Sequence, residues 1–124
     1  MSSNLGVWFN VPNGSKMEFW VEPDGNFSAT GTYDPDDDQN DEFWSSGDLV
    51  PGPVTRTVSS DASYAVRIDV VFQGEDAETT TIHARVTGPD NNPLGSPYDY
   101  SVTGKQGDAP RRANLTIINR NANG

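Results

Sequence analysis

The chain of 124 residues contains no cysteine, so disulfide bonds, thiolate metal sites and a cysteine nucleophile are excluded. It also lacks any apolar run near the roughly 20 residues that cross a bilayer, which predicts that it has no membrane span. The N-terminal segment MSSNLGVWFN has neither the basic nor the apolar region of a signal peptide. Localisation therefore stays open, and both the cytoplasm and release without a classical signal are compatible with the sequence.

Basic residues are scarce. Lys and Arg number 8 against 18 Asp and Glu, which gives a net charge of −10. A field of this sign repels phosphate backbones, so we expect binding neither to nucleic acid nor to anionic membranes. High solubility, a high-salt habitat, or carboxylates kept for cations all remain as explanations of the acidity.

Histidine is scarcer still, and this bears on catalysis. His83 is the single histidine, and the chain has no G-x-S-x-G motif. The sequence therefore gives almost no support for a Ser-His-Asp hydrolase or for a zinc site. Nothing singles out two of the 18 carboxylates as a glycosidase acid pair. We expect that the protein is not an enzyme.

Alternating apolar and polar residues are what the sequence does have, and no window shows a helical stripe. With 12 glycines and 9 prolines spread along the chain, the pattern predicts seven or eight short strands in one domain over 1–124. Such strands favour an all-β antiparallel β-sandwich, immunoglobulin-like or jelly-roll-like, with a small barrel as the alternative. The alternation places His83 on the outer face of its strand.

Two similar segments, WFNVPNG and FWVEPDG, stand near the N-terminus. Pro, then Asn or Asp, then Gly is a turn chemistry that joins hairpin strands. We therefore predict an N-terminal three-stranded meander over residues 5–33. In this register Phe9 and Phe19 face the core, while Trp8 and Trp20 lie on the opposite face.

The stretch 34–48 is predicted to be an acidic loop followed by an irregular segment. Its clustered carboxylates could supply the hard oxygen ligands that calcium prefers. The candidate metal ligands are Asp34, Asp36, Asp38, Asp41 and Glu42. An EF-hand is excluded, because Gln39 stands where glycine is required and Ser45 where glutamate is required. A solvated loop without metal is the alternative.

The outward tryptophans, together with nearby polar side chains, form the candidate ligand site. Its predicted residues are Trp8, Asn10, Glu18, Trp20, Thr30 and Trp44. Indole rings among such groups suit the stacking of a sugar ring or the anchoring of a protein partner. The alternative is that a loop covers this face and that the tryptophans are buried.

These features predict a non-enzymatic binding module that recognises a carbohydrate or a protein surface, with Ca2+ as an accessory. The alternative is an acidic structural or interaction protein, such as a virion, surface-layer or inhibitor component, that binds a basic partner. Homo-oligomer formation stays open under either interpretation.

Overall fold

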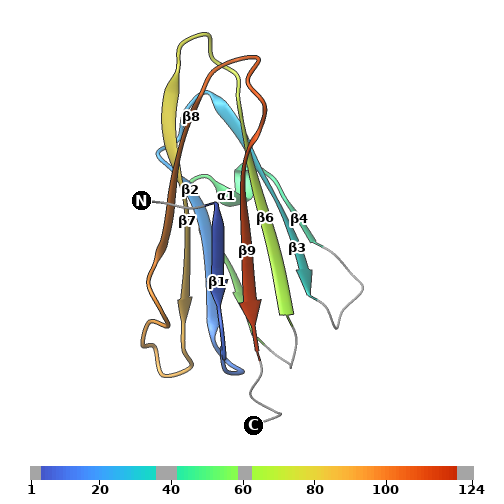
Figure 1. The fold of residues 1–124 in the computed structure, drawn as a ribbon, viewed down its shortest axis with the longest axis vertical. Coiled ribbons are helices and arrows are strands. Elements are labelled where there is room, and N and C mark those ends of the chain that lie inside the picture. The colour runs from blue at the N-terminus through green and yellow to red at the C-terminus, as the bar shows by residue number, and fades with distance from the viewer. Residues whose placement is uncertain (1–3, 36–41, 59–62, 120–124) are drawn as a thin grey trace.

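The computed structural model describes residues 4–35, 42–58 and 63–119. Two β-sheets pack face to face around one core (Figure 1). One sheet has five strands, in the order β1 (Leu5–Trp8), β9 (Arg111–Ile118), β6 (Ser63–Phe72), β3 (Phe27–Pro35) and β4 (Glu42–Trp44). The other has four, in the order β5 (Val54–Thr57), β2 (Lys16–Glu22), β7 (Glu78–Thr87) and β8 (Tyr98–Gly104). The prediction of an all-β sandwich is confirmed.

The core follows the predicted alternation in most strands. In β2 the side chains of Met17, Phe19 and Val21 are buried while their neighbours face outward. The same period-two pattern holds in β6, β7 and β9, because each strand has one face against the other sheet and one against solvent. Within the described residues, no helix has the length and apolar character needed to cross a membrane.

The segment predicted to be irregular contains regular structure. The chain forms β4 at Glu42–Trp44 and then one helical turn, α1, at Ser46–Leu49. Ser45 and Asp48 form a capping box at the start of α1, with the Ser45 N–H donating to the Asp48 carboxylate at 2.9 Å. With β4 included, the described residues form nine strands.

The predicted N-terminal meander is wrong. β1 and β3 belong to the five-stranded sheet, whereas β2 pairs with β5 and β7 in the other sheet. The Pro-Asn-Gly turn does form, with Gly14 at φ +89° and Ser15 N–H donating to Pro12 O at 3.2 Å. It carries the chain across the core instead of reversing it within one sheet. Turn chemistry fixes a local reversal, but not which strand becomes the hydrogen-bonded neighbour.

The buried and exposed faces of β1 are also the reverse of the prediction. β1 pairs in parallel with β9, and Trp8 lies opposite the buried Ile117 while Val7 lies opposite Thr116 on the outer face. Trp8 is consequently only 7% exposed, and Phe9 is 69% exposed. Both alternating sets of this strand contain apolar residues, so the pattern cannot assign the faces. The large indole fills the space at the edge of the core, in edge-on contact with Tyr98.

Candidate functional site

The candidate site lies on the outer face of the four-stranded sheet. β2 contributes Glu18, Trp20 and Glu22 to this face, because the alternate residues of that strand fill the core. Antiparallel pairing with β7 sets Glu18 opposite Arg85 and Trp20 opposite His83. The next strand, β8, sets Asp99 opposite His83. Trp20, His83 and Asp99 thus form one row across three strands, beside the neighbouring pair of Glu18 and Arg85.

Trp20 lies at the β2 end of this row and is half-buried. Its indole stacks on the His83 ring with centroids 5.0 Å apart and an interplanar angle of 17°. The Arg85 guanidinium carbon lies 5.6 Å from the indole centroid, within cation–π range. The indole N–H donates to Glu22 Oε2 at 3.0 Å. These contacts hold the ring in one orientation.

The charged groups around Trp20 pair with one another. Arg85 donates twice to Glu18 Oε1, from Nε at 3.0 Å and from an Nη atom at 2.8 Å. His83 lies between two carboxylates, with Nδ1 2.6 Å from Asp99 Oδ1 and Nε2 3.5 Å from Glu22 Oε2. The outcome is a fixed array of donors and acceptors on both sides of an aromatic ring.

A shallow hollow of about 240 Å³ opens beside Trp20. It is lined by Trp20, Glu22, Arg85 and two prolines, Pro51 and Pro53. The prolines come from the segment that leads from α1 into β5, and Gly52 between them lies close to the Trp20 side chain. The hollow therefore combines apolar walls with one anion and one cation, at a volume slightly below the roughly 300–1,000 Å³ of typical small-molecule pockets.

The other predicted ligand residues do not join this site. Trp8 is buried at one edge of the sandwich, which contradicts its predicted place on the outer face. Asn10 is exposed in the connection after β1, with φ at +56°. Thr30 faces outward from β3, and so belongs to the other sheet, where it lies opposite Asp69. Of the predicted set, the structure brings together only Glu18 and Trp20.

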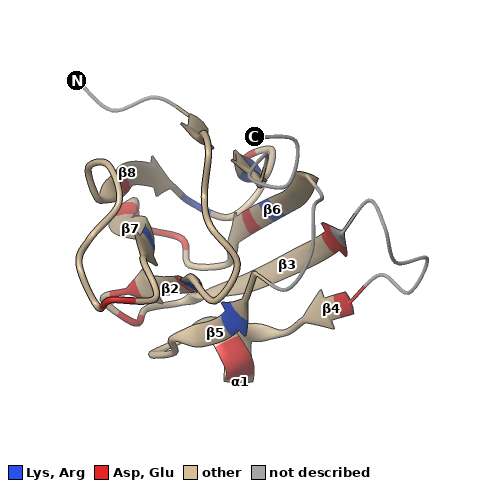
Figure 2. Cartoon of the chain, turned by 90° about the horizontal axis from the view of Figure 1, so that it is seen from below, with Lys and Arg blue, Asp and Glu red and all other residues tan. Residues whose placement is uncertain are grey.

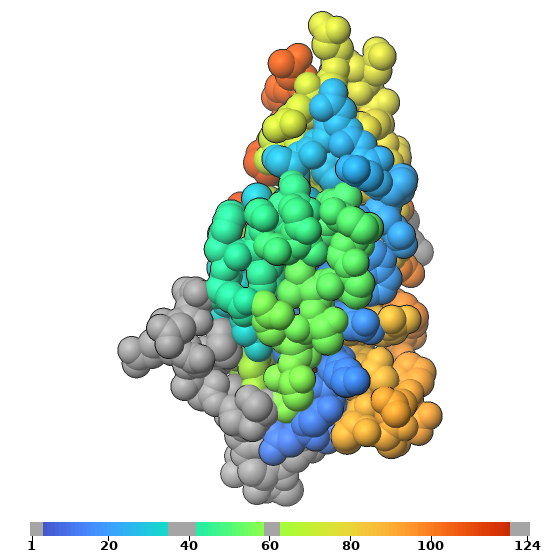
Figure 3. All heavy atoms as spheres, turned by 180° about the vertical axis from the view of Figure 1, so that it is seen from behind, coloured from blue at the N-terminus to red at the C-terminus, as the bar shows by residue number. Residues whose placement is uncertain are grey.

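Trp44 is likewise buried, at 2% exposure, where it closes one side of the sandwich. Its ring stacks between Phe19 and Tyr33, with centroids 5.5 Å and 5.6 Å away. Figure 3 shows the green segment that carries β4, α1 and β5 filling the middle of this side of the molecule. The ring therefore cannot serve as a stacking platform for a ligand.

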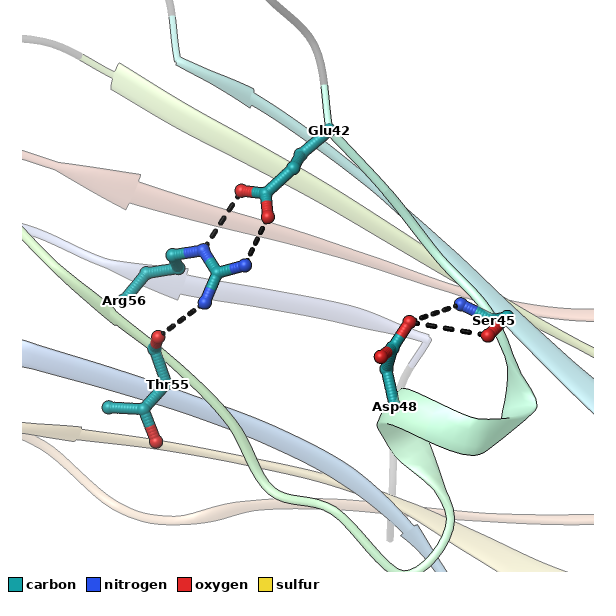
Figure 4. A network of polar contacts seen from close by, with 5 residues as sticks. All are labelled: Glu42, Ser45, Asp48, Thr55 and Arg56. Atoms are coloured by element: carbon teal, nitrogen blue, oxygen red, sulfur yellow. Dashed lines mark hydrogen bonds and ion pairs between the residues drawn. The ribbon is translucent and has the colours of Figure 1, made fainter.

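An ion pair between Glu42 and Arg56 joins the two edge strands on that side (Figure 4). Arg56 Nε donates to Glu42 Oε1 at 2.9 Å, and an Nη atom donates to the other carboxylate oxygen. These hydrogen bonds hold the pKa of Glu42 below its usual value. Glu42 and Arg56 also line a hollow of about 310 Å³, together with Trp44 and Asp48. Figure 2 shows the basic part of β5 beside the acidic α1.

The predicted calcium ligands fall mostly outside the described residues, as Asp36, Asp38 and Asp41 do. Asp34 is exposed near the end of β3. Glu42 directs its carboxylate to Arg56 in the ion pair described above. Among the described residues, no cluster of three or more His, Asp or Glu is arranged to hold a metal ion.

Sequence reasoning missed several residues of the Trp20 site. Alternation in β7 correctly predicts that His83 faces outward beside Thr81 and Arg85, but it does not indicate that this strand pairs with β2. Asp99 and the two prolines carry no sequence signal for the site.

No family model, curated protein or solved structure matches the chain.

Proposed function

We propose that the protein is a non-enzymatic binding module and that its recognition surface is the outer face of the four-stranded sheet. The observation that carries this proposal is the hollow of about 240 Å³ with Trp20 as one wall. Trp20 is half-buried and held by His83 and Glu22, so little side-chain entropy remains to be lost on binding. A fixed aromatic wall beside polar groups is the arrangement that ligand sites favour.

The ligand that fits this arrangement best is a carbohydrate unit. An indole ring offers an apolar surface for the C–H face of a sugar ring. Glu22 and Arg85, which also line the hollow, supply an acceptor and several donors for sugar hydroxyls. The hollow is small and open, which suits one sugar residue of a longer chain better than an enclosed metabolite.

The ionisable groups of this face support binding and not catalysis. Glu18 is engaged by Arg85, and His83 lies between Asp99 and Glu22. A general acid or base must reach the reacting group of a substrate. These contacts keep the surface rigid, and the Glu22 and Arg85 atoms outside them are the ones offered to a ligand.

Calcium in the 34–42 loop remains an accessory proposal. Because Arg56 engages Glu42, the ligands would come from Asp34 and from the aspartates at 36, 38 and 41. Adding and chelating calcium in the binding assay tests this contribution separately from the Trp20 site.

A glycan array, read with calcium and with a chelator, tests the proposed function. We expect binding to a defined set of glycans, and a loss of about 2 kcal/mol or more in binding free energy for Trp20→Ala. Phe9→Ala is the matched control, because Phe9 is an exposed aromatic residue outside the site. Equal binding by both variants, or an array without any binding, would refute carbohydrate recognition at Trp20.

A basic protein partner is the second candidate, and the net charge of −10 favours it. Attraction between opposite charges raises the association rate and falls with ionic strength. Sugar stacking depends little on salt. A ligand whose affinity falls steeply as salt is raised would therefore support the acidic interaction protein.

A further inference from the structure

The exposed large apolar side chains lie at the two edges of the five-stranded sheet. Within the described part of the chain these are Leu5, Val7, Phe9 and Phe43. Leu5 and Val7 project from the outer face of β1 because the alternate residues, Gly6 and Trp8, face the core. Phe43 projects outward from β4 because Trp44 points inward. Apolar groups thus border one face of one sheet on both sides.

The strand register aligns these groups in two rows across the sheet. The first row is Leu5, Asn114, Arg67, Thr32 and Phe43. The second row is Val7, Thr116, Ala65 and Asp34. With strands about 4.8 Å apart, the first row spans about 19 Å. A hollow of about 300 Å³ lies between the apolar edges, and its lining includes Thr32, Ala65 and Thr116.

The charges on this outer face cancel although the chain is strongly acidic. Arg67 and Arg112 face outward here together with Asp34 and Asp69, while the whole chain carries −10. Arg112 Nε donates to Asp69 Oδ1 at 2.7 Å. Two copies of an acidic protein repel each other at long range. A locally neutral face with apolar edges is where they approach at least cost.

We propose that this face is the contact surface between two copies of the chain. A two-fold axis running across the strands exchanges the two rows. Leu5 of one copy then lies against Val7 of the other, and Arg67 of one copy lies one strand spacing from Asp34 of the other. The apolar residues of β1 and the charges of Arg67 and Asp34 are thereby self-complementary, as an isologous contact requires.

The arrangement leaves the proposed ligand site accessible. The four-stranded sheets lie on the far sides of the two copies, so both Trp20 hollows face solvent. A dimer of this kind presents two sites to one multivalent ligand and increases its avidity. The dimer itself rests on the five-stranded sheet alone and does not depend on what Trp20 binds.

Sedimentation velocity over a concentration series tests the proposal. We expect concentration-dependent dimers, and dimerisation weakened by about tenfold or more in Val7→Lys, because that variant places a charge in an apolar contact. Thr103→Lys is the matched control, since Thr103 is exposed on the outer face of the other sheet. A monomer at every concentration, or equal dimerisation by both variants, overturns the proposal, and an extended peptide or glycan would then be the occupant to seek.

A charge exchange tests the symmetry, with circular dichroism used to confirm that each variant is folded. Arg67→Asp and Asp34→Arg should each weaken self-association, because each places like charges across the contact. An equimolar mixture of the two variants restores both opposite-charge pairs and should dimerise about tenfold more tightly than either variant alone. Failure of the mixture to dimerise more tightly overturns the proposed two-fold arrangement.

Discussion

Trp8 and Trp44 lie inside the sandwich, whereas Trp20 lies on its outer face. Trp8 is in edge-on contact with Tyr98, with ring centroids 6.4 Å apart, and Trp44 stacks on Phe19 and Tyr33. The neighbours of Trp20 are instead a histidine, an arginine and a carboxylate. Trp8 and Trp44 thus pack against aromatic rings, with the Arg56 guanidinium also 5.7 Å from the Trp44 ring, whereas the contacts of Trp20 are with polar groups.

The position in the sandwich explains this difference. Two packed sheets leave two open sides, where the edge strands cannot cover the core between them. Trp8 lies at the side bordered by β1 and β8, and Trp44 at the side bordered by β4 and β5. Trp20 lies on β2, an inner strand of its sheet, where the outer surface needs no filling. Its rigid polar surroundings therefore lie on the surface of the molecule.

The largest expected effect separates the interior from the outer face directly. Trp44→Ala should lower the free energy of unfolding by about 3–5 kcal/mol, because it removes a buried ring and leaves a cavity beside Phe19. Denaturant unfolding followed by circular dichroism measures this change. A loss below about 1 kcal/mol would contradict the assignment of Trp44 to the core.

Gly6→Val should have the next largest effect and tests the side closed by Trp8. A Cβ atom at Gly6 would lie 2.8 Å from Leu115 Cδ2 and 2.9 Å from Tyr98 Cδ1, so the added side chain overpacks this edge. We expect a loss of about 1–3 kcal/mol in the free energy of unfolding. Gly47→Ala is the control, because its Cβ meets only Ser45 Oγ at 3.9 Å. Equal unfolding midpoints for both variants would contradict the close packing around Gly6.

Trp20→Ala should cost only about 1 kcal/mol of stability, the scale of a lost aromatic pair with His83. The same variant should weaken the proposed glycan binding by about 2 kcal/mol or more. Thermal unfolding and the glycan assay, performed on one preparation, measure both quantities. A stability loss as large as that of Trp44→Ala would remove the distinction between the two regions.

Glu42→Gln should have the smallest effect at neutral pH, a few tenths to about 1 kcal/mol, because both side chains of the ion pair are partly exposed. The pKa of Glu42 is lowered in the folded protein, so its contribution is complete above the usual value of 4.5. It is lost as the pH falls through the lower folded pKa. The variant should therefore show a weaker decline of stability below pH 4.5 than the unchanged protein. Glu75→Gln, at an exposed position, should leave that decline unchanged.

The sequence predicts which side chains of a long strand face the core better than it predicts which strands pair with one another. Alternation assigns Phe19 and Trp20 to opposite faces correctly, because only one of the two sets in β2 is consistently apolar. It fails in β1, where Leu5, Val7 and Trp8 leave both faces apolar. Pairing partners depend on which faces bury the most surface together, and that is a property of the whole chain. The Trp20 site needs three strands in register, so its composition could not be predicted from local pattern.

The parallel pairing of β1 with β9 has a consequence for folding. Leu5 pairs with Asn114, so β1 cannot reach its partner until β9, the last described strand, has been synthesised. Contacts of such high sequence separation slow folding, because a long loop must close before they stabilise anything. On the ribosome, Leu5, Val7 and Trp8 therefore stay without this partner strand until β9 has emerged. Docking of β1 should be among the last steps of folding, and the nascent N-terminal segment is where aggregation would begin.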